Sequence, residues 1–466
     1  MKMIFNIKTD HWQRNIHKDQ SAQNNEHKTN RNYTIYSRSG FAPCPLPFAF
    51  YSLPFAIYLL PFAICLFLLP SKSIAQTAQP LDLKQAIELG SKNNLDIQAS
   101  ELESKMHAQL KGSAFEIPKT EVSGTFGQIN SNAKDKSFSI SQSFNPFQYG
   151  AKKSLLNENN AAGQLKVKVT KQETTFNIRQ SWNAMLYYTK QNQLLENQNK
   201  LMEKFVKAAS LKFQTGETNS LEKTVAIAKQ QELQQLIKQN DAKIWVEKSR
   251  IKALINRDTD FTPADTAFVA LSALSIADSS MIKQNSAIQL AAKQVHIAEA
   301  FKKVEKATLF PDITAGYAIQ SITGNQEVNG QAVYYDASPR FQTFSVGLAL
   351  PIFAGSSIAK TKAAQTNIDV QKKNAAYLEN QLKSQFQQQI QELHTYQSLV
   401  DYYKNTALPN AKKISNNATK AYQNGDISYV EYVQSIETAL NIQLNNSNAI
   451  HNFNQTAINI QYLINN

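Results

Sequence analysis

The sequence predicts a mixed α/β membrane protein made of two tandem repeats, each running helix, two strands, long helix and second helix. A matched pair of stretches supports the duplication, because Ala209 to Glu222 resembles Ala418 to Glu431 at an offset of 209 positions. Long amphipathic helical patterns enter and leave both stretches. Two short segments of alternating apolar and polar residues precede each long helix. A chain of 466 residues is therefore expected to form one duplicated body rather than about three unrelated domains.

The matched stretches have the residue types of a turn between two helices. Gly216 and Gly425 occupy equivalent positions, and glycine is the residue that most readily adopts the left-handed conformation that ends a helix. Acidic and hydroxyl residues follow each glycine, and these suit the N-terminus of the next helix. Each stretch is predicted to be the tip of a helical hairpin. The aligned pairs are Phe213 with Tyr422, Gln214 with Gln423, Glu217 with Asp426, Leu221 with Val430, and Glu222 with Glu431.

Residues 1–75 are predicted to be a leader that ends in a secretory signal peptide. A polar, basic start is followed by an apolar run from Phe41 to Pro70 and by the small-residue end Ser73-Ile74-Ala75, so cleavage is expected after Ala75. Residues 1–45 are interpreted as an over-long start assignment. A membrane anchor is the alternative, and prolines within the apolar run, at positions 47, 54, 61 and 70, argue against a spanning helix.

Cysteine and charge exclude several classes of function. Both cysteines, Cys44 and Cys65, lie in the leader, so disulfides, thiol catalysis and cysteine metal sites are not expected in the mature chain. The formal net charge of +13 is mild for this length, and part of it lies in the leader. No basic run with interleaved aromatic residues occurs, so nucleic-acid binding is not expected.

The first repeat is placed at residues 76–257. A helix is predicted over 81–115, and Pro118 ends it. Strands follow over 122–128 and 138–144, where aromatic and aliphatic residues alternate with Ser, Thr and Gly. The absence of proline then predicts one helix over about 152–214, which would be roughly 90 Å long at 1.5 Å per residue. A return helix over 221–256 completes the repeat.

Residues 258–277 are predicted to be a connector, and residues 278–466 a second repeat. The expected elements of the second repeat are a helix over 281–307, strands over 313–320 and 344–350 with a polar loop over 323–340 between them, a long helix over 357–424, and a return helix over 427–464. The long helix carries a seven-residue apolar repeat, which implies supercoiling against its neighbours. The residues of this repeat are Leu393, Val400, Ala407, Ile414 and Ala421. Pro409 predicts a kink within it.

Four strands of about ten residues are too few to close a barrel, and unpaired sheet edges are not tolerated in lipid. If the strands span a membrane, several chains must therefore contribute to one barrel. The alternation of apolar and small polar residues is typical of transmembrane strands, although the pattern of each segment is weak. Together with the secretory leader, it indicates a bacterial outer membrane.

Several short motifs, in this order along the chain, resemble those of the TolC-type outer membrane efflux proteins. The resemblance extends from Leu81 to the C-terminus. It comprises Leu81-Asp-Leu83 with Ala86-Ile87 and Asn93-Asn94, then Phe310-Pro311-Asp312-Ile313, then Leu408-Pro409-x-Ala411, and finally Ala421-Tyr422-x-x-Gly425-x-x-Ser428.

The resemblance implies a homotrimer with a shared 12-stranded β-barrel in outer membrane lipid and a long α-helical coiled-coil tunnel in the periplasm. It implies that the protein is the exit duct of a tripartite efflux or type I secretion system. The duct itself would conduct substrates passively. The partners would be a periplasmic adaptor (membrane fusion) protein and an inner-membrane efflux pump or ABC transporter. The adaptor-contacting residues would be Phe213, Thr215, Gly216, Glu217 and Thr218 in one tip and Tyr422, Asn424, Gly425, Asp426 and Ile427 in the other.

The resemblance also implies a periplasmic constriction lined by acidic side chains on the last helix. Glu431 matches one such position, whereas Gln434 stands where a second acid often occurs in the family. One acidic ring could still repel anions and favour cations. The alternative role for Glu431 is a solvated first-turn carboxylate favoured by the helix dipole.

Two other classes of function were weighed against the channel. An enzyme is disfavoured because no nucleophile elbow or phosphate loop occurs, and the histidines lack the spacing of metal ligands. These histidines are His107, His296, His394 and His451. No catalytic residue, metal site or cofactor is predicted. A periplasmic coiled-coil adaptor or scaffold without a channel would explain the hairpins, but the alternating strands at matching places in both repeats argue against it.

Overall fold

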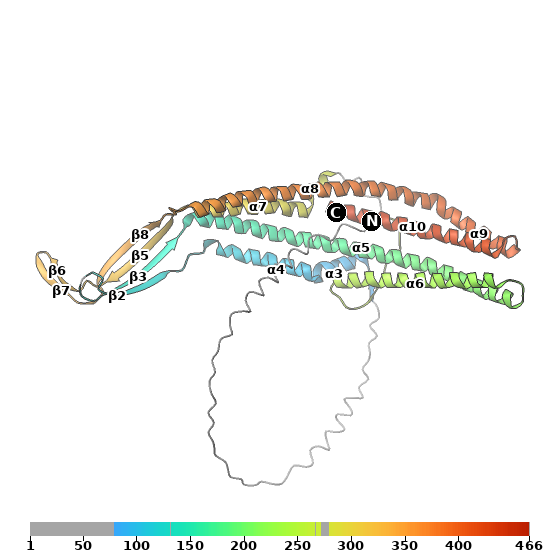
Figure 1. Cartoon of the computed structure of the whole chain (residues 1–466), viewed down its shortest axis with the longest axis horizontal. Helices are drawn as coiled ribbons and strands as arrows, with labels where there is room; N and C mark the ends of the chain where they lie inside the picture. Colours follow the sequence, from blue (N-terminus) through green and yellow to red (C-terminus); the bar gives the residue numbers. More distant parts are fainter. Residues whose placement is uncertain (1–78, 131, 266, 272–278, 466) are drawn as a thin grey trace, which may run out of the picture. The chain divides into compact units, whose positions relative to one another are not determined.

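The computed structural model describes residues 79–130, 132–265, 267–271 and 279–465. The predicted leader, with its cleavage site, its two cysteines and the assigned start, lies outside the described residues. The connector, predicted over residues 258–277, is described in part. The elements below follow one another along the chain from Gln79 to the end of the last helix (Figure 1).

The first repeat begins with two helices where one was predicted. These are α3 (Leu83–Asn93) and α4 (Leu95–Leu110), and a 3₁₀ turn, η1 (Lys111–Phe115), follows them. Asn94 separates the two helices, because its side-chain oxygen accepts hydrogen bonds from the backbone N–H groups of Asp96 and Ile97. Its side-chain amide donates to the carbonyl of Leu254, so the break is also fixed by the return helix. Asparagine commonly caps a helix in this way, and the single helix predicted over 81–115 was wrong at this point.

The rest of the first repeat follows the predicted order. Strands β2 (Glu121–Gly127) and β3 (Asp135–Phe144) lead into the long helix α5 (Pro146–Gln214), and α6 (Ser220–Leu254) returns. Helix α5 starts six residues before the predicted boundary, because Pro146 lies in its first turn and the Asn145 side chain caps it. Proline is well tolerated at that position, since its missing N–H would have no partner there.

The second repeat has the same order with one insertion. After the short turn η2 (Ser279–Gln284), its elements are α7 (Ser286–Ala307), β5 (Asp312–Gln320), β6 (Gly324–Val328), β7 (Gln331–Tyr335), β8 (Phe341–Ala349), α8 (Gly355–Tyr402), the π-helical turn η3 (Tyr403–Ala407), α9 (Leu408–Asn424) and α10 (Tyr429–Leu463). The segment predicted as a polar loop contains the hairpin β6–β7. Asn329 and Gly330 form its turn with φ of 56° and 79°, the backbone that an Asn-Gly hairpin turn requires.

The interruption predicted at Pro409 takes the form of a π-helical turn. The segment η3 comes directly before α9, and Pro409 lies in the first turn of α9. A proline inside a helix removes one backbone hydrogen bond and displaces the preceding turn, so the wider π turn accommodates it. The apolar repeat continues through this segment, with Val400, Ala407 and Ala411 buried on either side of the proline.

Strands of both repeats form one antiparallel sheet in the order β2-β3-β5-β8. The repeats meet at the β3–β5 pair, where Ser141 lies opposite Gly316. This register places the large apolar residues of the four strands on one face, with Phe341 at the start of β8 as the exception, and it places mostly Ser, Thr, Gly and other polar or small residues on the other. The apolar sheet face consists of Val122, Phe126, Phe138, Ile140, Phe144, Ile313, Tyr317, Ile319, Phe344, Val346 and Leu348.

The apolar sheet face is open in the described chain. Phe344 is 79% exposed and Val346 is 82% exposed, although both sit in regular strands. Strands β2 and β8 each have one neighbour in the sheet, so the outer edge of each carries backbone groups without a sheet partner among the described residues. An edge of this kind readily pairs with another strand.

The helices pack along α5, and the main core lies near their middle. The short strands β1 (Gln79–Leu81) and β4 (Phe261–Pro263) pair in parallel there. The buried cluster around them contains Leu81, Ala86, Ile178, Trp182, Met185, Ile251, Ile255 and Phe261. The rings of Trp182 and Phe261 stack with centroids 6.0 Å apart. This core packs both the first described residues and the part of the connector around Phe261 against the first hairpin. Strands of three residues are too short to be recognised in the sequence, so this contact was not predicted.

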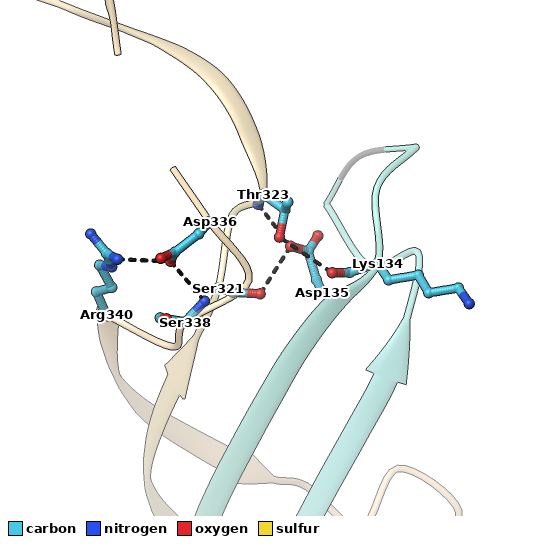
Figure 2. Close-up of polar contacts among 7 residues, drawn as sticks. All are labelled: Lys134, Asp135, Ser321, Thr323, Asp336, Ser338 and Arg340. Carbon is cyan, nitrogen blue, oxygen red and sulfur yellow. Dashed lines mark hydrogen bonds and ion pairs between the residues drawn. The ribbon is translucent and has the colours of Figure 1, made fainter. Parts of the chain in front are cut away.

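A buried carboxylate, Asp135, ties the two repeats together at the start of β3, the end of that strand away from α5. Figure 2 shows its polar contacts. Asp135 is 1% exposed, and it accepts hydrogen bonds from the backbone N–H of Thr323 at 2.8 Å and the hydroxyl of Ser321 at 3.0 Å. The N–H of Asn130 donates to its other oxygen at 3.1 Å. In the same region Asp336 accepts from the N–H of Ser338 and from Arg340, but it is exposed.

This contrast predicts unequal effects of two aspartate substitutions. Asp135→Ala should lower the free energy of unfolding by about 2 kcal/mol, because it leaves buried donors without an acceptor. Asp336→Ala should lower it clearly less, because its side chain and its partners are solvated. Thermal unfolding of the purified protein, with limited proteolysis between residues 321 and 340, measures both. Equal effects of the two substitutions would contradict this interpretation.

Candidate functional site

The two hairpin tips end their first helices with the same backbone geometry. Gly216 and Gly425 both adopt left-handed conformations, with φ of 79° and 80°. The N–H of Glu217 donates to the carbonyl of Lys212 at 2.8 Å, and the N–H of Asp426 donates to the carbonyl of Ala421 at 2.8 Å. These bonds, which span five residues, define the Schellman ending of a helix. The sequence alignment of the tips therefore corresponds to an equivalence in three dimensions.

The two return helices start differently. In the second tip Ser428 and Glu431 form a capping box, in which the N–H of Ser428 donates to the Glu431 carboxylate at 2.8 Å and the N–H of Glu431 donates to the Ser428 hydroxyl. In the first tip the Asn219 side chain caps α6 by accepting from the N–H of Glu222. The Glu222 carboxylate accepts instead from the hydroxyl of Thr218.

The two hairpin turns, between α5 and α6 and between α9 and α10, lie at the end of the helices away from the sheet (Figure 1). Phe213, Thr215, Gly216, Glu217, Asn424, Gly425 and Asp426 are exposed, and Thr218, Tyr422 and Ile427 are partly buried. The ammonium group of Lys223 lies 5.1 Å from the centroid of the Phe213 ring. The tips therefore offer backbone, carboxylate and aromatic groups to solvent, and nothing in the described chain covers them.

A second apolar core joins the two tips to each other. We call it the tip core, and its buried members are Met202, Ala209, Ala226, Ala418, Tyr429, Tyr432, Val433 and Ile436. The Phe205 ring packs against it, with its centroid 4.8 Å from that of Tyr432 and 5.7 Å from that of Tyr422. The sequence interpretation did not identify this cluster. The helical spacing of Leu201, Phe205 and Ala209 is consistent with an apolar face, but such spacing does not indicate which helix covers it.

An ion pair adds a polar link between the hairpins. The ammonium group of Lys229 in α6 lies 3.2 Å from the carboxylate of Glu437 in α10 and 3.1 Å from that of Glu232. Hydrogen bonds to these two carboxylates raise the pKa of Lys229 above its ordinary value. Because the side chains are partly exposed, the pair contributes little stability, about 1 kcal/mol or less, and it links α6 to α10.

Tyr429 carries a buried hydroxyl at the start of α10. Its oxygen is buried and forms no hydrogen bond within the described chain. Burial raises the pKa of Tyr429 to about 12, and the nearby charge of Glu222 acts in the same direction. The phenol is therefore neutral at physiological pH and acts as an apolar group with an unsatisfied donor.

The predicted constriction residues lie on the first turns of α10. Glu431 and Gln434 are both exposed, and the Gln434 backbone carbonyl accepts from the hydroxyl of Thr438. Hydrogen bonds from the N–H and hydroxyl of Ser428 lower the pKa of Glu431 below its ordinary value. The carboxylate is thus ionised and held in place by the capping box. Its role in a constriction stays a prediction, because that role involves neighbouring copies.

The described residues contain no group of three or more His, Cys, Asp or Glu side chains placed to hold a metal ion. None of the described helices is both long enough and apolar enough to cross a membrane.

Comparison with known proteins gives a uniform result at the level of fold. No family model and no curated protein sequence matches this chain. The solved structure of the CmeC outer membrane channel from Campylobacter jejuni matches with a TM-score of 0.69 at 14% identity, over 91% of this chain and 94% of CmeC. The outer membrane protein VceC from Vibrio cholerae matches with a TM-score of 0.65 at 13% identity, over 82% of this chain and 95% of VceC.

The open state of the MtrE outer membrane channel from Neisseria gonorrhoeae matches over 82% of this chain and 88% of MtrE, with a TM-score of 0.65 at 13% identity. This chain has the fold of the TolC-type outer membrane channels. The resemblance noted from sequence motifs is thereby confirmed for the fold.

The tip geometry predicts that glycine is required at the turns. Gly425→Ala should cost about 1 kcal/mol, because a side chain disfavours the left-handed conformation. The amide of Asp426 should then exchange with solvent about fivefold faster, as measured by hydrogen exchange. Gly150→Ala is the matched control, since Gly150 is helical and an added methyl group meets no other atom within 4 Å. Unchanged exchange in Gly425→Ala would contradict the assigned turn.

The buried Tyr429 hydroxyl predicts a pH-dependent effect. The pKa of Tyr429 is higher in the folded state than in the unfolded state, so the folded protein favours the neutral phenol. This contribution to the free energy of unfolding is fully present below pH 10, and it is lost as the pH rises through about 12. Tyr429→Phe should leave stability at pH 7 unchanged or slightly higher, because it removes an unsatisfied donor. It should also reduce the loss of stability between pH 10 and pH 12. Thermal unfolding across this range tests both, with Tyr432→Phe as the control.

Proposed function

We propose that this protein is an outer membrane channel with a periplasmic extension. The observation that carries the proposal is the sheet, which has one mostly apolar and largely exposed face and one face of mostly small and polar residues. Lipid would cover the apolar face, and the other would line an aqueous lumen. The fold shared with solved outer membrane channels supports the same conclusion.

The open strand edges support a trimer. Each unpaired backbone group in hydrocarbon costs several kcal/mol, so β8 of one copy must pair with β2 of the next. Three copies of the four-stranded sheet would close a 12-stranded barrel. The helices of three copies would then form the coiled-coil tunnel on the periplasmic side, and substrates would pass through it without an energy source in this chain.

The exposed tips are the proposed docking site for a periplasmic adaptor protein. The two turns lie at the end away from the sheet, and their residues have no covering element among those described. An inner-membrane efflux pump or ABC transporter would supply the energy, in a tripartite efflux or type I secretion system. The proposed contacts are the predicted ones, Phe213 to Thr218 and Tyr422 to Ile427.

Glu431 and Gln434 are proposed to line the periplasmic constriction. The capping box gives Glu431 a structural role as well, so replacing it by alanine would alter both helix capping and charge. Glu431→Gln separates these effects, because glutamine can still accept from the N–H of Ser428 while carrying no charge.

The proposal predicts single-channel conductance in a planar bilayer that favours cations. Glu431→Gln should reduce this selectivity with little change in melting temperature, and Glu431→Ala should also widen the conductance. Glu222→Gln is the matched control, since Glu222 holds the equivalent position in the first repeat. A protein that stays soluble without detergent and conducts no current would instead support the periplasmic coiled-coil scaffold.

A further inference from the structure

A groove lies between α5 and α10, away from the tips and the sheet. Its volume is about 570 Å³, which is in the range of sites for drug-sized molecules. We call it the α5–α10 groove and define it by Lys168, Lys171, Phe176, Arg179, Gln461 and Tyr462, which all line it. None of these residues belongs to the predicted tips or constriction.

Arg179 is the most unusual residue of the groove. It is partly buried, and its guanidinium group donates one hydrogen bond, from Nη1 to the side-chain oxygen of Gln461 at 2.9 Å. No acidic side chain of the described chain forms an ion pair with it. Removal of the guanidinium from water lowers the pKa of Arg179, and no nearby carboxylate offsets that effect. Arginine is rarely buried without an anionic partner, so this arrangement leaves donors available to a ligand.

Two lysines extend the positive charge along the same face of α5. Lys168 and Lys171 lie about two to three turns before Arg179, and both line the groove. Lys171 pairs with Glu101 of α4 at 2.7 Å, so it is neutralised in part. Lys168 is exposed and has no ion-pair partner among the described residues. Burial raises the pKa of Tyr462, and the negative charge of Glu173 near the groove acts in the same direction. The Glu173 side chain itself is exposed.

The wall of the groove between these charges is aromatic. The rings of Phe176 and Tyr462 stack with centroids 4.4 Å apart and an interplanar angle of 24°. Ile458, which is 5% exposed, closes the α10 side. An apolar surface beside fixed cationic donors is complementary to a molecule that has both an apolar body and an acidic group.

We propose that the α5–α10 groove binds an organic anion, with its carboxylate or sulfonate on Arg179 and its apolar body against Phe176 and Tyr462, while Lys168 adds positive charge farther along the groove. Such a ligand would contact the first repeat through α5 and the second through α10. The site does not depend on the proposed channel function, because every residue that forms it comes from one chain.

Binding of 1-naphthoate to the full-length protein in lipid nanodiscs tests the proposal, with empty nanodiscs as the blank. Isothermal titration calorimetry should detect naphthoate, whereas the neutral 1-naphthamide should bind at least several-fold more weakly. Arg179→Gln should raise the dissociation constant for naphthoate roughly tenfold, because a charged hydrogen bond is lost. Lys168→Gln should raise it roughly threefold, as expected for an exposed cation.

Lys190→Gln is the matched control, because Lys190 lies on the same helix outside the groove. It should leave naphthoate binding unchanged. Lys168 is exposed, so Lys168→Gln should not disturb folding. It therefore still tests the role of positive charge in naphthoate binding if the Arg179→Gln protein proves unstable. Equal binding of naphthoate and naphthamide, or equal dissociation constants for Lys168→Gln, Arg179→Gln and Lys190→Gln, would overturn the proposal.

Discussion

The structure depends on a sheet that a single chain leaves incomplete. Four strands give two outer edges, β2 and β8, and one face of exposed aromatic and aliphatic side chains. In water this arrangement would expose both backbone groups and apolar surface, and in lipid the unpaired edges would cost still more. Self-association within a membrane would remove both costs, and this is the physical reason for proposing that several copies share one barrel.

The sequence indicated the order of elements well, because long helices and alternating strands have strong periodic patterns. The strand register could not be read from it, since pairing Ser141 with Gly316 depends on contacts across 175 positions. The break at Asn94 and the hairpin at Asn329-Gly330 had local signals that were overlooked, an asparagine cap and an Asn-Gly turn. The three-residue strands β1 and β4 are too short for any pattern to indicate them.

The candidate site was predicted in part. The glycine turns were correctly placed because left-handed backbone strongly favours glycine, and Gly216 and Gly425 both adopt it. The sequence did not show that the two turns share a core, because a helical apolar face carries no information about which helix covers it. Nor did it show that the Glu431 carboxylate is held by Ser428, although the Ser-x-x-Glu spacing is the known signature of a capping box.

The tip core limits how the two hairpins can move. Phe205 of α5 contacts tyrosines from α9 and α10, and the Lys229–Glu437 pair joins α6 to α10. Separating the hairpins would expose this aromatic cluster to water, at roughly 25 cal/mol for each Å² of apolar surface. Small residues such as Ala209, Ala226 and Ala418 allow the helices of the two hairpins to approach closely. Their short side chains interdigitate little with the neighbouring helix. Relative motion of the hairpins is therefore expected to be a sliding of helices past one another rather than a separation.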